Sequence, residues 1–448
     1  MDKGFIRSGN ILSGSVNSTL LRFALPIILG NIFQQLYNLI DAVVVGNFLG
    51  DLSLSGISVA SPIMDIATAL IIGGTIGIGV LIARLFGGGQ NTKLKITNST
   101  ALIGGIILTF LISLIGIFIS PRILTLQGTE RDVCTEAMRY LRVVFLSMPF
   151  CFLYNYYASA LRSCGNSSAP FLILLVSSCL HVGLDLLLVA VFHAGIVGIA
   201  LSTALCQLFS AVWCILYACN KYPALSLKRG EFRYSHAEAG VLLTYAWAAA
   251  LQQAVVCIGR LLIQGMLTSL GTLTVTGYNM GMRIEQFAFC FSQGVSAAMV
   301  VCISQNIGHS DRIRAGKFYK AGIRTAVCMA IVIAVIFRCF PARLITMFSD
   351  NTEVIAAGAE YIGIMSFFYL SAFVDEMIQG FFRGLGRLRL TMIASFGQIF
   401  LRVLLSVFLI PLYGISGICI SVITGWLLLA LAEGGYSIYI YNKSMLTA

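Results

Sequence analysis

Long apolar stretches alternate with short polar connections along the whole chain. Twelve such stretches can be counted, each with the roughly 20 predominantly apolar residues that cross the hydrocarbon core of a bilayer. They occupy residues 20–46, 55–83, 97–120, 137–161, 168–192, 195–219, 239–266, 276–304, 321–341, 355–382, 390–411 and 414–441. The pattern predicts an all-α polytopic membrane protein with 12 transmembrane helices.

The second half of the chain repeats the first at an offset of 221 residues. The recurring positions are Leu49 and Gly50 with Leu270 and Gly271, Gly56 with Gly277, Gly87 with Gly308, and Arg162 and Gly165 with Arg383 and Gly386. Two further blocks match at offsets of 218 and 219, as loop insertions would produce: Gln34 and Gln35 with Gln252 and Gln253, and Gly195 and Gly198 with Gly414 and Gly417. Many secondary transporters are built from such repeats. Because each copy has an even number of helices, we expect two six-helix lobes of the same orientation, related by an axis along the membrane normal.

The longest polar connection separates the two copies. It runs from residue 220 to 238 and includes Lys221, Pro223 and Arg233. We therefore predict an N-terminal six-helix lobe at 1–219, a cytoplasmic inter-lobe linker at 220–238 and a C-terminal six-helix lobe at 239–448. Within the second predicted helix, the spacing of Gly73, Gly74, Gly77 and Gly79 favours close packing of a neighbouring helix over a ligand-binding role.

Composition supports a membrane protein, because 58% of the residues are hydrophobic, only 10% are charged and the mean hydropathy is +0.91. The formal net charge of +11 reflects Lys and Arg residues that gather in alternate connections. On one side lie, among others, Lys3, Arg7, Lys93, Lys95, Lys228, Arg229, Arg233, Arg312, Arg314, Arg387 and Lys443. By the positive-inside rule this side is cytoplasmic, and both termini lie there. Because these basic residues follow alternate connections, they indicate how the chain is oriented in the lipid bilayer. They do not indicate nucleic acid as a partner.

Nothing in the sequence points to a cofactor or a resident metal. The glycine run at 87–89 lacks the GxxxxGK[ST] pattern of a phosphate-binding loop, so an ion gradient is the expected source of energy. The 13 cysteines form no CxxC pair and are expected to be small buried hydrophobic residues. We expect a monomer that is not an enzyme, since an integral membrane enzyme would need a clustered acidic or histidine-rich site.

Acidic residues inside apolar stretches are costly and usually functional or paired. In the first copy, Asp41 and Asp185 both reach the outer half of the predicted membrane, where they can share one cavity. His181 precedes Asp185 by four residues and so lies on the same helix face. Such carboxyl groups can load and release a proton, or hold a sodium ion with other oxygen ligands. Asp41, Asp185 and His181 are therefore the candidates for a coupling-ion site, with H+ and Na+ both open.

In the second copy, Arg402 occupies the position equivalent to His181. Asp375 and Glu376 lie on the preceding helix, and we expect one of them to pair with Arg402 and the other to line the substrate path. Arg260, Arg283 and Glu285 are expected to neutralise one another as structural ion pairs. Glu433, in the last helix, is expected to serve packing.

Amide side chains and one proline complete the set of candidates. Uncharged hydrogen bonds to a cargo are expected from the cavity candidates Asn31, Gln34, Gln35, Gln252 and Gln253. Pro26 removes one backbone hydrogen bond in the first helix and permits a bend before Asp41. We predict that it acts as a hinge.

These residues resemble those of the multidrug and toxic compound extrusion (MATE) transporters, over nearly the whole chain. The likeness is carried by Leu25 and Pro26 through Gln35, by Asp41, Gly46, Leu49 and Gly50, by Leu161, Arg162 and Gly165, by Asp185, Gly195 and Gly198, and in the second copy by Gln305, Asn306, Gly308, Glu376, Arg383, Gly384 and Gly386. The resemblance implies a V-shaped pair of six-helix lobes and matches Asp41 and Asp185 to the cation site of the amino-terminal lobe. The chain departs from the family pattern at His181, where Asn is frequent, at Leu186, where Pro is frequent, and around Ala254 to Val256, where one branch has a glutamate.

The sequence thus predicts a secondary active, cation-coupled (H+ or Na+) antiporter that exports organic cations, drugs or toxic compounds across a prokaryotic plasma membrane. A flippase or exporter of lipid-linked saccharide precursors is the alternative. That activity predicts a basic cavity for pyrophosphate, whereas acids outnumber bases within the apolar stretches here.

Overall fold

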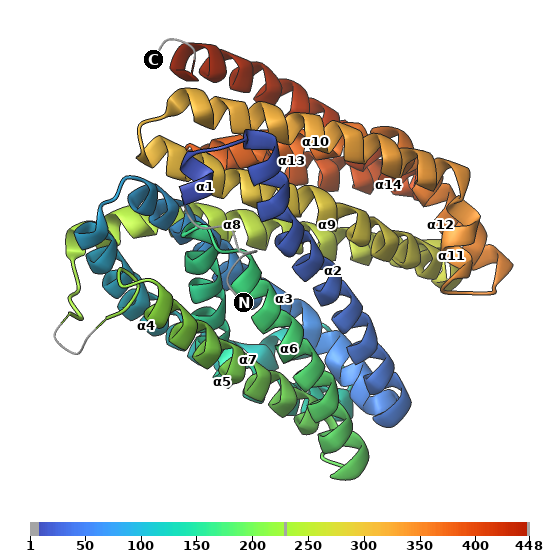
Figure 1. Cartoon of the computed structure of the whole chain (residues 1–448). Helices are drawn as coiled ribbons and strands as arrows, with labels where there is room; N and C mark the ends of the chain where they lie inside the picture. Colours follow the sequence, from blue (N-terminus) through green and yellow to red (C-terminus); the bar gives the residue numbers. More distant parts are fainter. Residues whose placement is uncertain (1–8, 228–230, 446–448) are drawn as a thin grey trace. The chain divides into compact units, whose positions relative to one another are not determined.

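The computed structural model describes residues 9–227 and 231–445, and every regular element within them is a helix (Figure 1). The elements are α1 (Gly9–Leu12), α2 (Val16–Phe48), α3 (Gly50–Gly87), α4 (Asn91–Leu126), α5 (Arg131–Ser163), α6 (Ser168–Asp185), η1 (Leu186–Val191), α7 (Gly195–Lys221), α8 (His236–Leu267), η2 (Thr268–Leu270), α9 (Thr272–Gly308), α10 (Arg312–Cys339), α11 (Pro341–Thr346), α12 (Thr352–Met365), η3 (Ser366–Phe368), α13 (Tyr369–Gly384) and α14 (Leu388–Met445). Of the basic residues assigned above to the cytoplasmic side, Lys3, Arg7, Lys228 and Arg229 lie outside the described residues.

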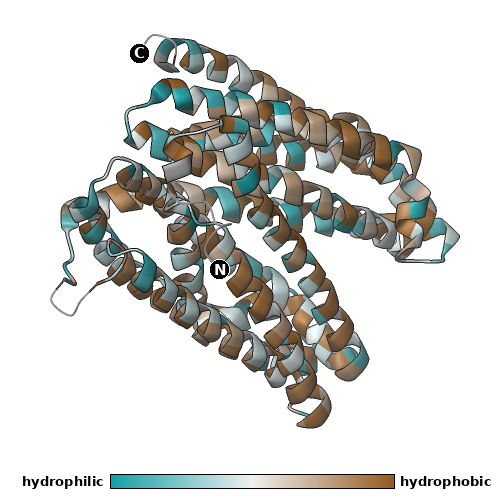
Figure 2. Cartoon of the chain, in the orientation of Figure 1, coloured by the Kyte–Doolittle hydropathy of each residue, from teal (hydrophilic) through white to brown (hydrophobic). Residues whose placement is uncertain are grey.

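The helices confirm a polytopic membrane protein. Eleven helical spans among the described residues are long and apolar enough to cross a bilayer. The last two predicted stretches, 390–411 and 414–441, both lie in α14, where Gly414 (φ 57°, ψ −127°) breaks the helical geometry. Figure 2 shows hydrophobic residues along the helices and hydrophilic residues concentrated in connections and at helix ends.

The internal repeat is visible in the backbone. Gly50, the first residue of α3, and its equivalent Gly271, directly before α9, both adopt positive φ angles, 72° and 86°. Gly195 and Gly414 likewise share φ angles of 60° and 57°. Positive φ is easily reached only by glycine, so the recurring glycines mark turns that both copies use. The sequence repeat therefore reflects a structural repeat.

Two compact units can be distinguished, and each receives part of α2 and part of α8. The described residues between Leu29 and Cys257 form unit 1, and Gly9–Ile28 with the described residues from Ile258 onward form unit 2. The two units are defined by packing contacts, whereas the lobes predicted at 1–219 and 239–448 are defined by the sequence repeat. The lobe boundaries therefore stay a prediction.

The described part of the linker is fastened to α4 within unit 1. Lys95 forms an ion pair with Glu231 (2.8 Å), and the Thr97 hydroxyl donates to Glu238 (3.0 Å). The backbone N–H of Arg233 donates to Ser99 Oγ (2.8 Å). The polar residues at the start of α4 thus satisfy the backbone and carboxyl groups of the linker.

Helix packing within each unit positions the polar residues discussed below. In unit 1, α5 lies between α3, α4 and α7, and α6 packs on α7. In unit 2, α9 packs against α10, α12 and α13, and α13 packs against α14. Residues of α6 and α7 therefore meet in unit 1, and residues of α13 and α14 meet in unit 2.

Candidate functional site

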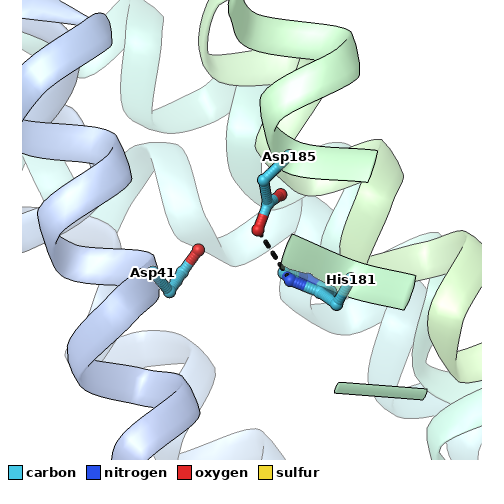
Figure 3. A group of neighbouring side chains, drawn as sticks. All are labelled: Asp41, His181 and Asp185. Carbon is cyan, nitrogen blue, oxygen red and sulfur yellow. Dashed lines mark ion pairs between the residues drawn. The ribbon is translucent and has the colours of Figure 1, made fainter. Parts of the chain in front are cut away.

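Asp41, His181 and Asp185 come together in unit 1 (Figure 3). Asp41 projects from α2, and His181 and Asp185 project from the same face of α6 toward it. One ligand-type atom of each residue lies within 4.8 Å of those of the other two. His181 and Asp185 are 3% and 1% exposed, and Asp41 is partly buried. The structure thus assembles the three residues that the sequence singled out, and we call them the triad.

The hydrogen bonds of His181 constrain where protons lie in the triad. Its Nε2 atom lies 3.1 Å from the Thr203 hydroxyl oxygen and 3.3 Å from that of Tyr37. The single hydroxyl hydrogen of Thr203 is directed to the Ile199 carbonyl (3.0 Å), so toward His181 this hydroxyl can only accept. Nε2 therefore carries a hydrogen, a tautomer inferred from its partners.

The other ring nitrogen of His181 meets Asp185. Nδ1 lies 2.7 Å from Asp185 Oδ2, the distance of an ion pair when the ring is protonated. With one proton between the two atoms, the pair is an imidazolium with a carboxylate or a neutral imidazole with a carboxylic acid, and its net charge is zero in both cases. The hydroxyl of Ser202 donates to Asp185 Oδ1, so both oxygens of Asp185 are engaged.

Asp41 is the member of the triad with an open oxygen. Its Oδ1 is buried and has no hydrogen-bond partner among the residues that the structure describes. With one proton shared between His181 and Asp185, an ionised Asp41 gives the triad one net negative charge. The site can therefore take up one further proton, or its oxygens can ligate a monovalent cation.

The sequence analysis missed Tyr37, Ser202 and Thr203, which position His181 and Asp185. Tyr37 precedes Asp41 by four residues, and its ring packs edge-on against that of His181 with the ring centroids 4.9 Å apart. That spacing could have identified Tyr37. Hydroxyl residues in apolar helices commonly bond their own backbone, as Thr100 and Thr109 do here, so Ser202 and Thr203 carried no comparable signal.

The equivalent region of unit 2 is built around Glu285. This carboxylate is 5% exposed, accepts hydrogen bonds from the hydroxyls of Tyr361 (2.5 Å) and Tyr369 (3.4 Å), and interacts electrostatically with Arg402 and Arg260. Three of the four predicted ion-pair candidates are therefore neighbours.

Arg283, the fourth ion-pair candidate, is exposed, and no ion pair of it is found among the described residues.

The predicted pairing of Arg402 with Asp375 or Glu376 is wrong. Glu376 instead pairs with Arg383 (2.5 Å), and the acid that interacts with Arg402 is Glu285. At 1.5 Å per residue, Arg402 lies about 21 Å into α14, whereas Glu376 lies only about 12 Å from the end of α13 that leads into α14. The two side chains thus sit at different depths of the antiparallel pair.

The remaining candidates are scattered over helices of both units. Gln34 is exposed, Asn31, Gln35 and Gln253 are half-buried, and Gln252 is buried. Pro26 lies within the continuous helix α2, two residues before the point where α2 passes from unit 2 to unit 1. Their predicted roles as cavity lining and hinge stay predictions.

A match to a known protein family covers parts of both repeats. The model of the MatE family matches residues 26–187 and 248–408. Each matched segment contains one of the regions described above, the triad in the first and Glu285 with Arg402 in the second.

Proteins of similar sequence and structure span nearly the whole chain. The chain is 27% identical over 432 residues to the multidrug export protein MepA of Staphylococcus saprophyticus, which is 93% of this chain and 92% of that protein. It is 26% identical over 384 residues to the probable multidrug resistance protein YpnP of Bacillus subtilis, 85% of each. A solved structure of a multidrug resistance MATE family transporter of the MOP superfamily in an outward-facing conformation has a TM-score of 0.91, 18% identity and full coverage of both chains. A MATE crystal structure in complex with MaL6 also has a TM-score of 0.91 and 18% identity, covering 99% of this chain and 100% of that one.

Proposed function

Because the chain belongs to the MatE family, we propose that it is a secondary active antiporter that exports organic cations across a prokaryotic plasma membrane in exchange for an inward-moving cation. The names of its relatives, multidrug export and multidrug resistance proteins, support export of drug-like compounds. The observation that carries the proposal is the triad of Asp41, His181 and Asp185 in membrane-spanning helices. Ionisable groups at that depth are costly unless they serve transport or pairing.

The coupling ion in this proposal is the proton. In this proposal His181 and Asp185 share one proton, and both oxygens of Asp185 are engaged by His181 and Ser202. A sodium ion needs free lone pairs on several oxygens, whereas protonation of Asp41 needs only one. The proton therefore suits the triad better than sodium does.

Helix α2 offers a route from the triad to conformational change. Asp41 belongs to the part of α2 in unit 1, and Pro26 belongs to the part in unit 2. Protonation of Asp41 removes a negative charge next to the neutral pair and weakens its attraction to the His181 ring. In this proposal the loss of that attraction shifts the population of α2 conformers, with Pro26 as the point of bending.

The substrate in this proposal is a small organic cation, with both termini of the transporter on the cytoplasmic side. Acidic groups in a low-dielectric setting attract such cations. Asn31, Gln34, Gln35, Gln252 and Gln253 stay candidates for uncharged contacts with the cargo.

The test is transport by the purified full-length chain in liposomes, with ethidium as the cationic probe and a proton or a sodium gradient imposed separately. We expect ethidium flux to follow the proton gradient and to fall at least about tenfold in Asp41→Asn, the loss that corresponds to about 1.4 kcal/mol. Asp132→Asn, at an exposed aspartate of the same unit, is the matched control and should transport normally.

Two outcomes would contradict the proposal. Unchanged proton-driven flux in Asp41→Asn would remove the triad from the coupling mechanism. Absence of gradient-driven flux for ethidium and for a panel of other organic cations would favour the flippase alternative, which is then tested with a lipid-linked saccharide in the same liposomes.

A further inference from the structure

Four side chains form a continuous row on the surface of unit 2, at the end of α14. Tyr436, Tyr439 and Lys443 are spaced at i, i+3 and i+7, so they share one face of the helix. Arg387, in the connection before α14, donates a hydrogen bond to the Tyr436 hydroxyl (3.0 Å). The rings of Tyr436 and Tyr439 stack with centroids 6.2 Å apart, and Lys443 Nζ donates to the Tyr439 hydroxyl (3.4 Å). We call these four residues the ladder.

The ladder faces outward. Arg387 and Lys443 are exposed, and Tyr436 and Tyr439 are 39% and 54% exposed. The acid nearest to them along α14, Glu433, is 4% exposed and therefore lies inside unit 2 instead of on this face. No ion pair of Arg387 is found among the described residues, so its charge is available to a group from outside the chain.

Every polar group of the ladder can donate a hydrogen bond to such a group. The side chains of Arg387 and Lys443 have no acceptor atom, and each tyrosine oxygen here accepts a bond from one of them. Each tyrosine therefore keeps its own O–H hydrogen, and neither hydrogen has an acceptor among the described residues. Two cations and two O–H donors suit a ligand that is negatively charged and only accepts, as a phosphate group is.

The depth of the ladder decides which kind of phosphate it meets. The apolar span that contains α14 ends at Lys443, and exposed tyrosines followed by a lysine are typical of the membrane–water interface. Leu428 lies three turns before Tyr439 on the same face and is 51% exposed, and Leu431 is 74% exposed. Such side chains face lipid acyl chains in a membrane-spanning helix. A phosphate beside acyl chains is the headgroup of a phospholipid.

The repeat indicates that the fold does not require the charges of the ladder. The equivalent of Arg387 at the 221-residue offset is Asn166, and the equivalent of Tyr436 at the 219-residue offset is Tyr217. Asn166 donates to the Tyr217 hydroxyl at the same distance, 3.0 Å. The equivalents of Tyr439 and Lys443 are Asn220 and Ala224. Unit 1 thus keeps the contact with a neutral amide, and the cations of unit 2 add chemistry that packing does not use.

We propose that Arg387, Tyr436, Tyr439 and Lys443 bind the phosphate headgroup of an anionic phospholipid, in the leaflet on the side that the sequence predicts to be cytoplasmic. The phosphate oxygens accept from the two tyrosine hydroxyls between the two cations, and the acyl chains lie along the exposed leucines of α14. Because the donors come from both ends of α14, a bound headgroup fastens the end of this helix to its start. The site is independent of the coupling ion and of the cargo.

Native mass spectrometry of the purified full-length chain in detergent tests the site, with phosphatidylglycerol and phosphatidylcholine of the same acyl chains as probes. The wild type should bind phosphatidylglycerol more tightly than phosphatidylcholine. Lys443→Gln should weaken phosphatidylglycerol binding about fivefold, the equivalent of about 1 kcal/mol for one basic residue. Tyr439→Phe, which keeps the ring and the charge, should weaken it at least about twofold through the loss of one hydrogen bond.

Two further variants separate the ladder from net charge and from folding. Lys320→Gln is the matched control, because Lys320 is also an exposed lysine of unit 2 and lies 4.9 Å from the ring centre of another tyrosine of α14, Tyr441. It should bind phosphatidylglycerol as the wild type does. Lys443→Arg keeps the charge and should also bind as the wild type does, so a folding failure of Lys443→Gln does not leave the question open.

Three outcomes would overturn the inference. Equal affinity of the wild type for the two lipids would mean that the ladder does not recognise an anionic headgroup. Equal losses in Lys320→Gln and Lys443→Gln would mean that net charge alone attracts the lipid. Displacement of phosphatidylglycerol by an equal concentration of glycerol 3-phosphate, which has the phosphate without acyl chains, would assign the site to a soluble anion. None of these measurements depends on transport, so a failure of the proposed function would leave them intact.

Discussion

At the residue scale, His181 is the side chain that most affects the choice of coupling ion. Its ring can carry one or two N–H groups, its Nδ1 lies 2.7 Å from Asp185 Oδ2, and its Nε2 contacts the hydroxyls of Thr203 and Tyr37. An amide at the same place can bond Asp185 but cannot share a proton with it. Asp185 and Asp41 would then be two carboxylates beside an amide oxygen, an arrangement that resembles a sodium site.

We therefore expect His181→Asn to exchange one coupling ion for another. Export driven by a proton gradient should fall about tenfold, which corresponds to about 1.4 kcal/mol, and a sodium gradient should begin to drive ethidium flux. The measurement is the same liposome assay with each gradient imposed alone. Thr203→Val, which removes only the acceptor behind the ring, is the control and should keep its preference for protons. Unchanged ion dependence in His181→Asn would show that the imidazole does not select the ion.

At the element scale, helix periodicity and glycine spacing predicted most of what the structure contains. The glycine pattern of α3 predicted a close neighbour, and a Cβ on Gly73 or Gly77 would collide with the backbone of α8 at Ala249 or Tyr245, within unit 1. Gly74, one position along, has nothing within 4 Å of its Cβ position. The sequence could not say which glycine faces the neighbour, because that depends on the rotation of α3 about its axis, which packing determines.

This difference gives a stability prediction. Gly77→Val should destabilise unit 1 by about 1–3 kcal/mol, because the new side chain meets backbone atoms that cannot rotate away. Gly74→Val carries the same change in helix propensity at an open position, so the difference between the two variants isolates the collision. Thermal unfolding of each purified variant in the same detergent measures it. Equal melting temperatures for the two variants would mean that α3 and α8 do not approach at Gly77.

At the scale of the whole molecule, the repeat preserves the framework and changes the chemistry. Tyr140 and Tyr361 are equivalent positions of the repeat, as are Met64 and Glu285. The Tyr140 hydroxyl contacts the Met64 sulfur at 3.6 Å, and the Tyr361 hydroxyl donates to Glu285 at 2.5 Å. His181 and Asp185 correspond to Arg402 and Ser406. The register of the repeat could be predicted from sequence. The partner of Arg402 could not, because it depends on how far along α13 and α14 each charge lies.

Arg402 and Glu285 should behave as a permanent structural group, since an arginine does not lose its proton at accessible pH. Glu285→Gln and Arg402→Gln should each lower the melting temperature, because Arg402→Gln leaves the buried Glu285 and Glu285→Gln leaves the half-buried Arg402 with less compensation. The double variant should lose about 0.5–3 kcal/mol less stability than the two single variants lose together, and this difference is the interaction energy of the pair. Thermal unfolding of the wild type, the two single variants and the double variant measures it.

Ethidium flux measures the ion dependence of the same four proteins. All four should keep the proton dependence of the wild type, because the exchangeable protons belong to other residues. A switch in ion dependence in either single variant would mean that unit 2 loads its ion at Glu285, and the division of roles between the repeats would then have to be redrawn around that residue.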